Sequence, residues 1–332
     1  MVQRSERLEE LDDHVARLKA LSLEESTKKS YRSYRKRYLD FCELYNLVPV
    51  PVSMSQAARY VGYLSESLSA SSIPKYLTIL RVLHFEQGLP DPHVMHMHEV
   101  KSVLTGVAKL KGLQAHRVKP LTPSLLLKMF DVLDLCNLDN LMFLTACLVG
   151  FYGLLRKSNL FPPSKGEFSI HKHLSRGALV PKEWGIELQV QWTKTIQCKE
   201  RVLCIPLLSL PGHKLCPVTL LRACFVKTPQ FGPSSPMFYR YTQKGELIPM
   251  LYKWFLEKLR DTLSLIGENP GDFGSHSLRR GGASWALHCG LSSDVIKLLG
   301  DWQSSAYQAY LELPPDRKLV HMRAFVGTIP PV

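Results

Sequence analysis

This sequence lacks the features that mark secreted, membrane-spanning and repetitive proteins. Its eight cysteines form no C-x-x-C pair, and several stand in apolar runs, where a reduced thiol behaves as a small hydrophobic side chain. We therefore expect an intracellular protein without a disulfide framework. The charged first residues contain no apolar signal-peptide core, and the longest apolar stretch, residues 141–155, is too short to cross a bilayer. Internal repeats and low-complexity tracts are also missing.

Acidic residues are in short supply as well. The 332 residues include 42 Lys and Arg against 29 Asp and Glu, which gives a net charge of +13. Such an excess predicts attraction to a polyanion, of which nucleic acid is the most common. The chain is long enough for two domains that each bury a core of their own.

Helical periodicity covers most of the chain and is interrupted by one alternating segment. In residues 185–192 apolar and polar side chains alternate, and a second apolar run follows after a polar tip, which predicts a β-hairpin. We expect a mainly α-helical protein with a small antiparallel β-sheet. A basic segment with two prolines separates two helical runs and has the composition of a linker. The expected parts are a peripheral helix at 1–21, a helical domain at 22–113, the linker at 114–121 and an α+β domain at 122–332.

The first helix of the helical domain combines an aromatic face with a basic face. We expect the aromatic residues to pack in the core, because they all fall on one side of the helix. The basic face would contact the DNA backbone, since clustered Lys and Arg supply most of the affinity for phosphates. A nuclear import signal and a merely solvated face are the alternatives. The basic residues are Lys28, Lys29, Arg32, Arg35 and Lys36.

The densest functional signal lies near the C-terminal end. His276 and Arg279 are three residues apart at the start of a predicted helix, so both project from one face. Trp302 stands in the loop after the next helix, within the tripeptide G-D-W. Tyr307 and Tyr310 lie three residues apart on a last short helix.

Two further motifs stand upstream. FYGLLRKSNL ends a buried apolar helix and contains Arg156. WTKT lies at the tip of the predicted hairpin and contains Lys194. Taken singly, each of these residues would more often be structural than catalytic.

Together and in this order, the motifs resemble the catalytic signature of the tyrosine recombinases, also called phage-type integrases. The helical domain resembles the family's core-binding domain, so the similarity covers roughly residues 22–325. The resemblance implies an enzyme that cuts and rejoins double-stranded DNA through a covalent 3′-phosphotyrosyl intermediate, as a homotetramer on two DNA sites. It implies no cofactor, no metal and no membrane.

The chemistry of these residue types fits that reaction. Guanidinium groups carry forked donors that stay charged, so Arg156 and Arg279 suit the oxygens of a phosphodiester under attack. A tyrosine becomes a covalent nucleophile when a base such as His276 takes its proton. Lys194 would protonate the departing 5′ oxygen, and the indole N–H of Trp302 would hold a phosphate oxygen.

Two assignments have competitors. Tyr310, eight residues after Trp302, is favoured as the nucleophile over Tyr307, because DWQSSAYQAY is similar to the pattern in eukaryotic mobile elements of the DIRS and Crypton kind. Bacterial members typically have a gap of nine. Lys194 is favoured over Lys199 because WTKT matches the lysine motif better than CKER does.

The sequence also leaves the biological role open. We expect Arg117 and Lys119 of the linker, and Arg280 on the surface, to face DNA. The expected function is a recombinase or integrase from a mobile element, active in the nucleus if the host is eukaryotic. A domesticated, catalytically silent DNA-binding protein is the alternative, and a topoisomerase-like enzyme that reseals the same strand would share the chemistry.

Overall fold

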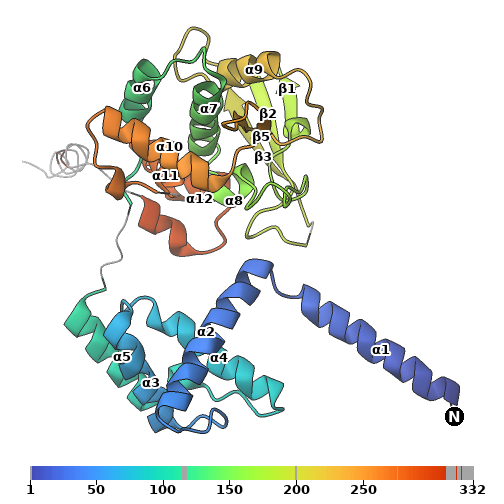
Figure 1. Ribbon diagram of the computed structural model, residues 1–332. Helices are drawn as coiled ribbons and strands as arrows, with labels where there is room; N and C mark the ends of the chain where they lie inside the picture. Colours follow the sequence, from blue (N-terminus) through green and yellow to red (C-terminus); the bar gives the residue numbers. More distant parts are fainter. Residues whose placement is uncertain are drawn as a thin grey trace, which may run out of the picture. The chain divides into compact units, whose positions relative to one another are not determined.

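The chain folds as two compact units, Met1–His116 and Arg117–Val332, each with a hydrophobic core of its own (Figure 1). The computed structural model describes residues 2–113, 118–198, 200–274 and 276–311, together with Leu319 and Arg323. For residues 2–6, Ala306, Ala309 and Tyr310 it describes the backbone alone.

In the described part of the N-terminal unit, all regular secondary structure is helical. Its core joins one face of α2 to the helices that follow, and Tyr38, Phe41 and Tyr60 are among its largest fully buried side chains. Tyr38 meets Tyr60 edge-on at 4.9 Å between ring centroids, a favourable aromatic geometry. Tyr38 and Phe41 of the aromatic face of α2 therefore form core as predicted, and Tyr31 and Tyr34 pack against it, but Tyr45 near the end of the face is exposed. The elements are α1 (Val2–Leu21), α2 (Glu25–Leu44), α3 (Met54–Ser67), α4 (Ile73–Glu86), η1 (Val94–His96) and α5 (His98–Lys111).

The C-terminal unit is built around one buried helix, α7. Its residues 141–151 are all buried, which explains why its sequence is apolar on every side. In Figure 1, α6 and α10 lie on one side of α7, and α9 and the strands lie on the other. The helices are α6 (Pro123–Val132), α7 (Leu138–Tyr152), α8 (Lys157–Leu160), η2 (Arg176–Ala178), α9 (Pro217–Lys227), α10 (Tyr252–Leu265), η3 (Pro270–Asp272), α11 (Ser277–His288), α12 (Ser293–Leu299) and η4 (Ser305–Tyr310).

Two small antiparallel sheets complete this unit. The predicted hairpin is present: β2 pairs with β3, and Leu188 stands opposite Ile205 with both side chains buried. The strand before it, β1, and a second pair, β4 with β5, have no signal in the sequence because they are only three or four residues long. The strands are β1 (Leu179–Lys182), β2 (Gly185–Val190), β3 (Leu203–Leu208), β4 (Tyr239–Tyr241) and β5 (Leu247–Pro249).

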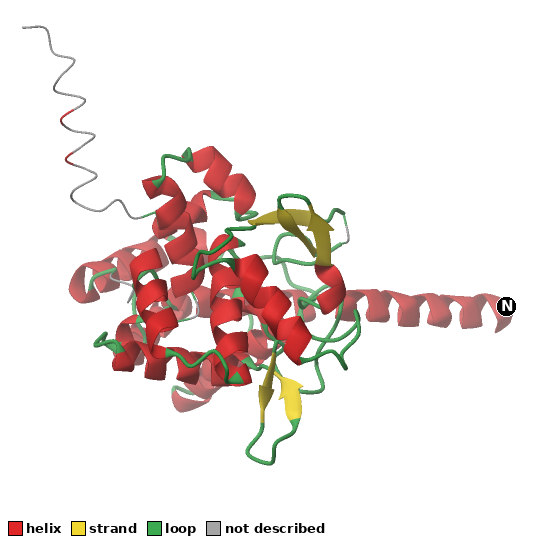
Figure 2. Cartoon of the chain, turned by 90° about the horizontal axis from the view of Figure 1, so that it is seen from above, coloured by secondary structure: helices red, strands yellow, loops and turns green. Residues whose placement is uncertain are grey.

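The fold class expected from the sequence is confirmed. Helices dominate both units, and in the part of the chain that the structure describes, strands occur only as short segments of the second unit (Figure 2). The element that carries the candidate nucleophile is a 3₁₀ helix, η4. Among the described residues, no helix is both long enough and apolar enough to span a membrane.

Candidate active site

The turn that carries Arg156 is set by the end of α7. Gly153 follows the helix as its C-cap, where a Cβ atom would meet the carbonyl oxygen of Val149 at 2.7 Å. Leu154 then adopts a left-handed backbone with φ of 48°, and the chain reverses. Arg156 is the N-cap residue of α8 and is half-buried. The motif thus places the arginine on a tight turn, just past a rigid helix.

His276 and Arg279 lie at the start of α11, which packs unusually close to its neighbours. A Cβ atom on Gly281 would lie 1.9 Å from the carbonyl oxygen of Leu121, and one on Gly282 would lie 2.1 Å from that of Phe151. Only glycine permits this backbone contact. Gly281 and Gly282 therefore allow the first turns of α11 to pack against the segment before α6 and against the end of α7.

Arg279 joins three segments of the chain. It is only 3% exposed, and its guanidinium donates hydrogen bonds to the carbonyl oxygens of Leu154 and, at 2.5 Å, Gly300. Its central carbon also lies 3.8 Å from the centre of the Trp302 ring, within cation–π range. Arg279 thereby ties the turn before Arg156 to the loop that leads to η4.

Positive charge gathers around His276. Although the residue is exposed, the surrounding protein desolvates its imidazole, and Arg279, Lys157 and Arg156 add like charge, so the pKa of His276 is lowered. A neutral imidazole can accept a proton, which is what a general base must do. The three cations would attract a phosphate to the same place. Lys157 was not among the predicted site residues; it lies 4.1 Å from the centre of the Tyr252 ring.

Lys194 lies exposed at the tip of the turn between β2 and β3. Two hydrogen bonds, one buried and one partly buried, connect this turn to the rest of the site. The Thr193 hydroxyl donates to the Asp301 carboxylate at 2.6 Å. The Asn159 side-chain amide, three residues after Arg156, donates to the Trp192 carbonyl oxygen at 2.8 Å. The turn is thus linked both to the Arg156 segment and to the loop after α12.

Trp302 and Tyr307 are packing residues in this structure. Both are buried in a small cluster with Leu154, Ala283 and Ile296, and their ring centroids lie 6.0 Å apart. Trp302 therefore packs against both Arg279 and Tyr307 of η4. Tyr310 is the last residue of η4, and its side chain lies outside the described part of the structure. The choice between the two tyrosines stays a prediction, with Tyr307 occupied in packing.

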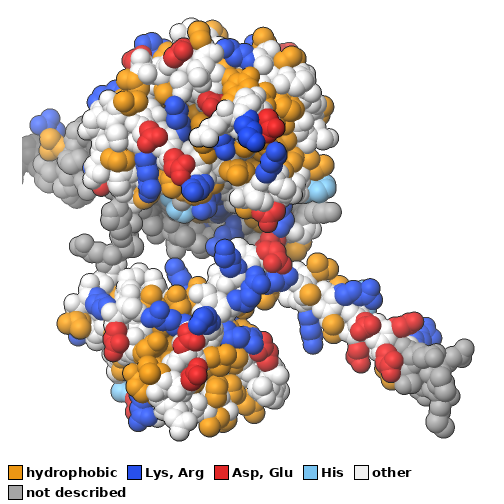
Figure 3. All heavy atoms as spheres, in the orientation of Figure 1, with side chains coloured by type: hydrophobic (Ala, Val, Ile, Leu, Met, Phe, Trp, Pro, Cys, Tyr) orange, Lys and Arg blue, Asp and Glu red, His pale blue; other side chains and the backbone are white. Residues whose placement is uncertain are grey.

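The basic face of α2 is present, and Figure 3 shows Lys and Arg side chains clustered over this helix. Lys29 and Arg32 are exposed. The other three predicted DNA contacts form ion pairs within the unit: Lys28 with Glu25 at 2.7 Å, Lys36 with Asp40 at 3.0 Å, and Arg35 with Glu86.

The remaining predicted DNA contacts have different outcomes. Lys119 is paired with Asp272 at 2.7 Å, and this carboxylate raises the pKa of Lys119. Arg280 was expected to be a surface charge, and that expectation is wrong. It is 6% exposed, because the glycines that follow it press α11 into the unit. Arg117 lies outside the described residues, as does Lys199, the alternative to Lys194 as the general acid.

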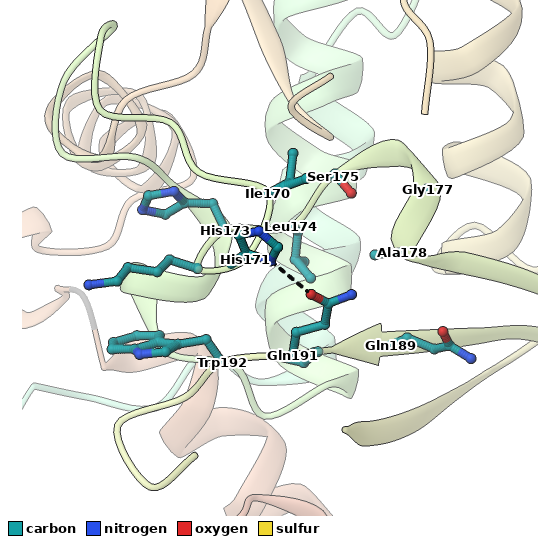
Figure 4. Close-up of a pocket in the computed structure, with 12 residues that line it drawn as sticks. Ile170, His171, His173, Leu174, Ser175, Gly177, Ala178, Gln189, Gln191 and Trp192 are labelled. Atoms are coloured by element: carbon teal, nitrogen blue, oxygen red, sulfur yellow. Dashed lines mark hydrogen bonds between the residues drawn. The ribbon is translucent and has the colours of Figure 1, made fainter. Parts of the chain in front are cut away.

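A pocket beside the Lys194 turn is distinct from the cluster of predicted site residues. Figure 4 shows His171, His173 and Trp192 along one side of it, with His171 hydrogen-bonded to Gln191 at 3.3 Å. His173 accepts a hydrogen bond from the Ser169 backbone, and burial lowers its pKa. Of the predicted catalytic residues whose side chains the structure describes, none lines this pocket, so we do not place the reaction there.

The structure adds residues that sequence reasoning missed. Asn159 was not among the predicted site residues, and its side-chain amide donates a hydrogen bond to the Trp192 carbonyl oxygen. Asp301 lies inside the G-D-W motif but has no obvious partner in the sequence. Its partners, Thr193 and Thr195, are more than one hundred residues away. The threonines of WTKT were the available signal, because they flank the candidate lysine.

Comparison with known proteins identifies the fold. No protein-family model and no curated protein matches this chain. The Tn1549 transposon integrase in complex with transposon right end DNA matches with a TM-score of 0.61 and 15% identity, over 92% of this chain and 95% of that one. A lambda integrase dimer bound to a COC′ core site matches with a TM-score of 0.54 and 16% identity, over 91% and 94%.

A third structure agrees with these two. XerH site-specific recombinase, in a post-cleavage complex with palindromic difH substrate, matches with a TM-score of 0.56 and 10% identity, over 88% of this chain and 77% of that one. The chain therefore has the fold of the tyrosine recombinases, as the order of its motifs predicts.

Proposed function

We propose that this protein is a site-specific DNA recombinase that cuts and rejoins strands through a covalent 3′-phosphotyrosyl intermediate on Tyr310. The observation that carries the proposal is the convergence of Arg156 with His276 and Arg279 from two separate segments, the turn before α8 and the start of α11, beside the loop that leads to η4. Such convergence provides both a basic site for a phosphodiester and a group that can take a proton. The fold shared with DNA-bound recombinases supports the same function.

The reaction needs four tasks, and the chain has a candidate for each. The Tyr310 oxygen attacks phosphorus, and His276 takes its proton. The half-buried Arg156 binds the non-bridging oxygens. The buried Arg279 stabilises their negative charge electrostatically. The bond from phosphorus to the 5′ oxygen breaks, and Lys194 supplies the proton that this oxygen takes up. Rejoining reverses the steps with a 5′ hydroxyl as the attacking group, so no outside energy source is consumed.

The broader setting is part of the proposal. We propose a homotetramer that holds two double-stranded DNA sites and exchanges strands between them. The eight-residue spacing from Trp302 to Tyr310 supports an origin in a eukaryotic mobile element, and hence a nuclear location. The exposed basic residues of α2 support binding along the DNA backbone.

A covalent-capture experiment tests the function and selects the target sequence in the same step. Wild-type protein is incubated with a pool of nicked duplexes that carry a randomised sequence, so that a cleaved strand loses its leaving fragment and cannot be resealed. Denaturation-resistant protein–DNA adducts are then recovered and sequenced. We expect adducts enriched in one sequence class. Binding without any adduct would instead identify the silent DNA-binding protein, and adducts without sequence preference would indicate a topoisomerase-like enzyme.

A further inference from the structure

Near the candidate site lies the Asp301 carboxylate, which has several hydrogen-bond partners and no role in the reaction proposed above. The Asp301 side chain is 2% exposed. Its Oδ2 accepts hydrogen bonds from the Thr193 hydroxyl, at 2.6 Å, and from the Thr195 hydroxyl. Its Oδ1 is paired with the Arg201 guanidinium. All three donors come from the connection between β2 and β3, so one carboxylate holds this connection at several points.

The two threonines belong to the turn that carries Lys194. The backbone amide of Thr193 donates to the Ile196 carbonyl at 3.1 Å, and the Ile196 amide donates back at 3.2 Å. The Thr193 hydroxyl oxygen, besides donating to Asp301, accepts from the amides of Thr195 and Ile196 at 3.0 and 3.1 Å. The backbone of the turn is therefore closed around Thr193, while the Lys194 side chain stays exposed at the tip.

The backbone around Asp301, the partner of this turn, is also held by several contacts. Asp301 has a left-handed backbone with φ of 53°, a conformation that persists in a non-glycine residue when its surroundings fix it. Gly300 before it accepts the hydrogen bond from Arg279 at 2.5 Å. Trp302 after it packs on Arg279 and on Tyr307 of η4. Asp301 thus sits between the Lys194 turn and the segment that ends at Tyr310.

From this geometry we propose that Asp301 is a positioning residue for Lys194. It fixes the position of the Lys194 turn relative to Arg279 and to the segment that carries Tyr310. The inference rests on the proposed function, in which Lys194 protonates the departing 5′ oxygen. Proton transfer requires the acid within hydrogen-bond reach of the leaving group. A turn tied to the nucleophile's own segment meets that requirement, because the two groups then move together.

The charge state of Asp301 favours these hydrogen bonds at neutral pH. Burial by itself would raise the pKa of Asp301, but hydrogen bonds from Thr193, Thr195 and Arg201 outweigh it and hold the pKa below its usual value. The carboxylate therefore stays ionised and accepts all three bonds at neutral pH. An amide in its place would keep the shape but would turn one acceptor oxygen into a donor.

The test separates positioning of the acid from general support of the fold. Single-turnover cleavage is measured on two versions of a captured target duplex. One has the ordinary scissile phosphodiester, and the other has sulfur in place of the 5′ bridging oxygen. A thiolate leaves without being protonated, because thiols are far more acidic than alcohols. Loss of a positioned acid should therefore slow only the ordinary substrate.

For Asp301→Asn we expect ordinary cleavage to fall about 100-fold or more, the range of general acid catalysis, while the sulfur substrate stays within a few-fold of wild type. Lys194→Ala should show the same pattern, and the double variant should be no slower than Lys194→Ala alone, because both changes remove one function. Thr193→Ser keeps the hydroxyl and should restore most of the activity that Thr193→Val loses. Asp294→Asn, the same change at an exposed position on α12, should alter neither rate.

Equal slowing of both substrates by Asp301→Asn would overturn the inference, since it would show that Asp301 merely maintains the fold. Unchanged rates would overturn it as well, and both results would leave the proposed function intact. Failure of wild type to form any adduct would refute the proposed function instead. The tie itself is then tested by amide hydrogen exchange in full-length protein. Asp301→Asn should speed exchange at Thr195 and Ile196, and unchanged exchange there would contradict the tie.

Discussion

The guanidinium carbon of Arg279 lies 3.8 Å from the centre of the Trp302 ring, and both residues are buried. This stacking and the hydrogen bonds that Arg279 donates to the carbonyl oxygens of Leu154 and Gly300 together fix the guanidinium. A guanidinium held in this way has little freedom to turn away from the site. Trp302 thus stabilises the geometry around Arg279.

The first prediction concerns this packing. Trp302→Ala should lower the free energy of unfolding of the C-terminal unit by about 3–5 kcal/mol, the usual cost of emptying a large buried aromatic site. Trp302→Phe should cost less, because it keeps a ring beneath Arg279. Denaturant titration followed by circular dichroism measures both. Trp285→Ala, at an exposed tryptophan on α11, should change stability by about 0.5 kcal/mol or less. Equal costs at the two tryptophans would contradict the assignment.

The second prediction distinguishes the two tyrosines. Tyr310→Phe should form no covalent adduct on the nicked duplex pool, because it lacks the attacking oxygen. Tyr307→Phe keeps the ring that packs on Trp302 and should still form adducts. The measurement is the amount of adduct that survives denaturation. Adducts from Tyr310→Phe would exclude Tyr310 as the nucleophile.

The third prediction concerns Asn159, which is 1% exposed and donates to the Trp192 carbonyl. Asn159→Asp should destabilise the protein by about 3 kcal/mol or more at neutral pH, since it leaves a buried carboxylate against a carbonyl oxygen. Burial raises the pKa of such a carboxyl, so the cost should shrink as pH falls through that raised pKa and should vanish below about 4, the usual aspartate pKa, where the group becomes protonated in both states. Thermal unfolding across pH measures the effect. Asn137→Asp, at an exposed N-cap that tolerates aspartate, should be nearly neutral.

The fourth prediction follows from the lowered pKa of His276. Above the usual histidine pKa, near 6.5, the imidazole is neutral in both states and has no effect. Below it, the unfolded chain takes up the proton more readily than the folded protein, so acidification weakens the fold. Wild type should therefore lose thermal stability relative to His276→Gln as pH falls from about 7.5 to about 5.5. A difference that stays constant with pH would show that the histidine is not perturbed.

The fifth prediction addresses the basic face of α2. If exposed Lys29 and Arg32 contact phosphates, their joint replacement by alanine should weaken binding to any duplex. It should also reduce the slope of log affinity against log salt by about 0.9 per residue. Fluorescence anisotropy with a labelled duplex at several salt concentrations provides both values. Lys214→Ala, at a lysine already paired with Asp131 at 2.6 Å, is the control. An unchanged slope would remove α2 from the DNA interface.

Much of this protein could be read from local pattern. The period of α2, the apolar run of α7 and the alternation around Leu188 each depend on neighbours within a few residues, so the fold class and the central hairpin followed from the sequence. The order of the arginine, lysine, histidine and tryptophan motifs also led to the tyrosine recombinase fold. The short strands β1, β4 and β5 did not, because three or four residues carry too little pattern.

The environment of each site residue was decided by tertiary structure alone. Arg279 and Arg280 are adjacent and chemically identical, and the sequence predicted a surface position for the second. Both are buried, because Gly281 and Gly282 allow α11 to touch the backbone of two other segments. Likewise, nothing local pairs Asp301 with Thr193, which stands 108 positions earlier. The sequence by itself determined which chemical groups are present and in which order. Their burial, their partners and the tie that holds Lys194 depend on contacts between distant segments, which form only when the whole unit packs.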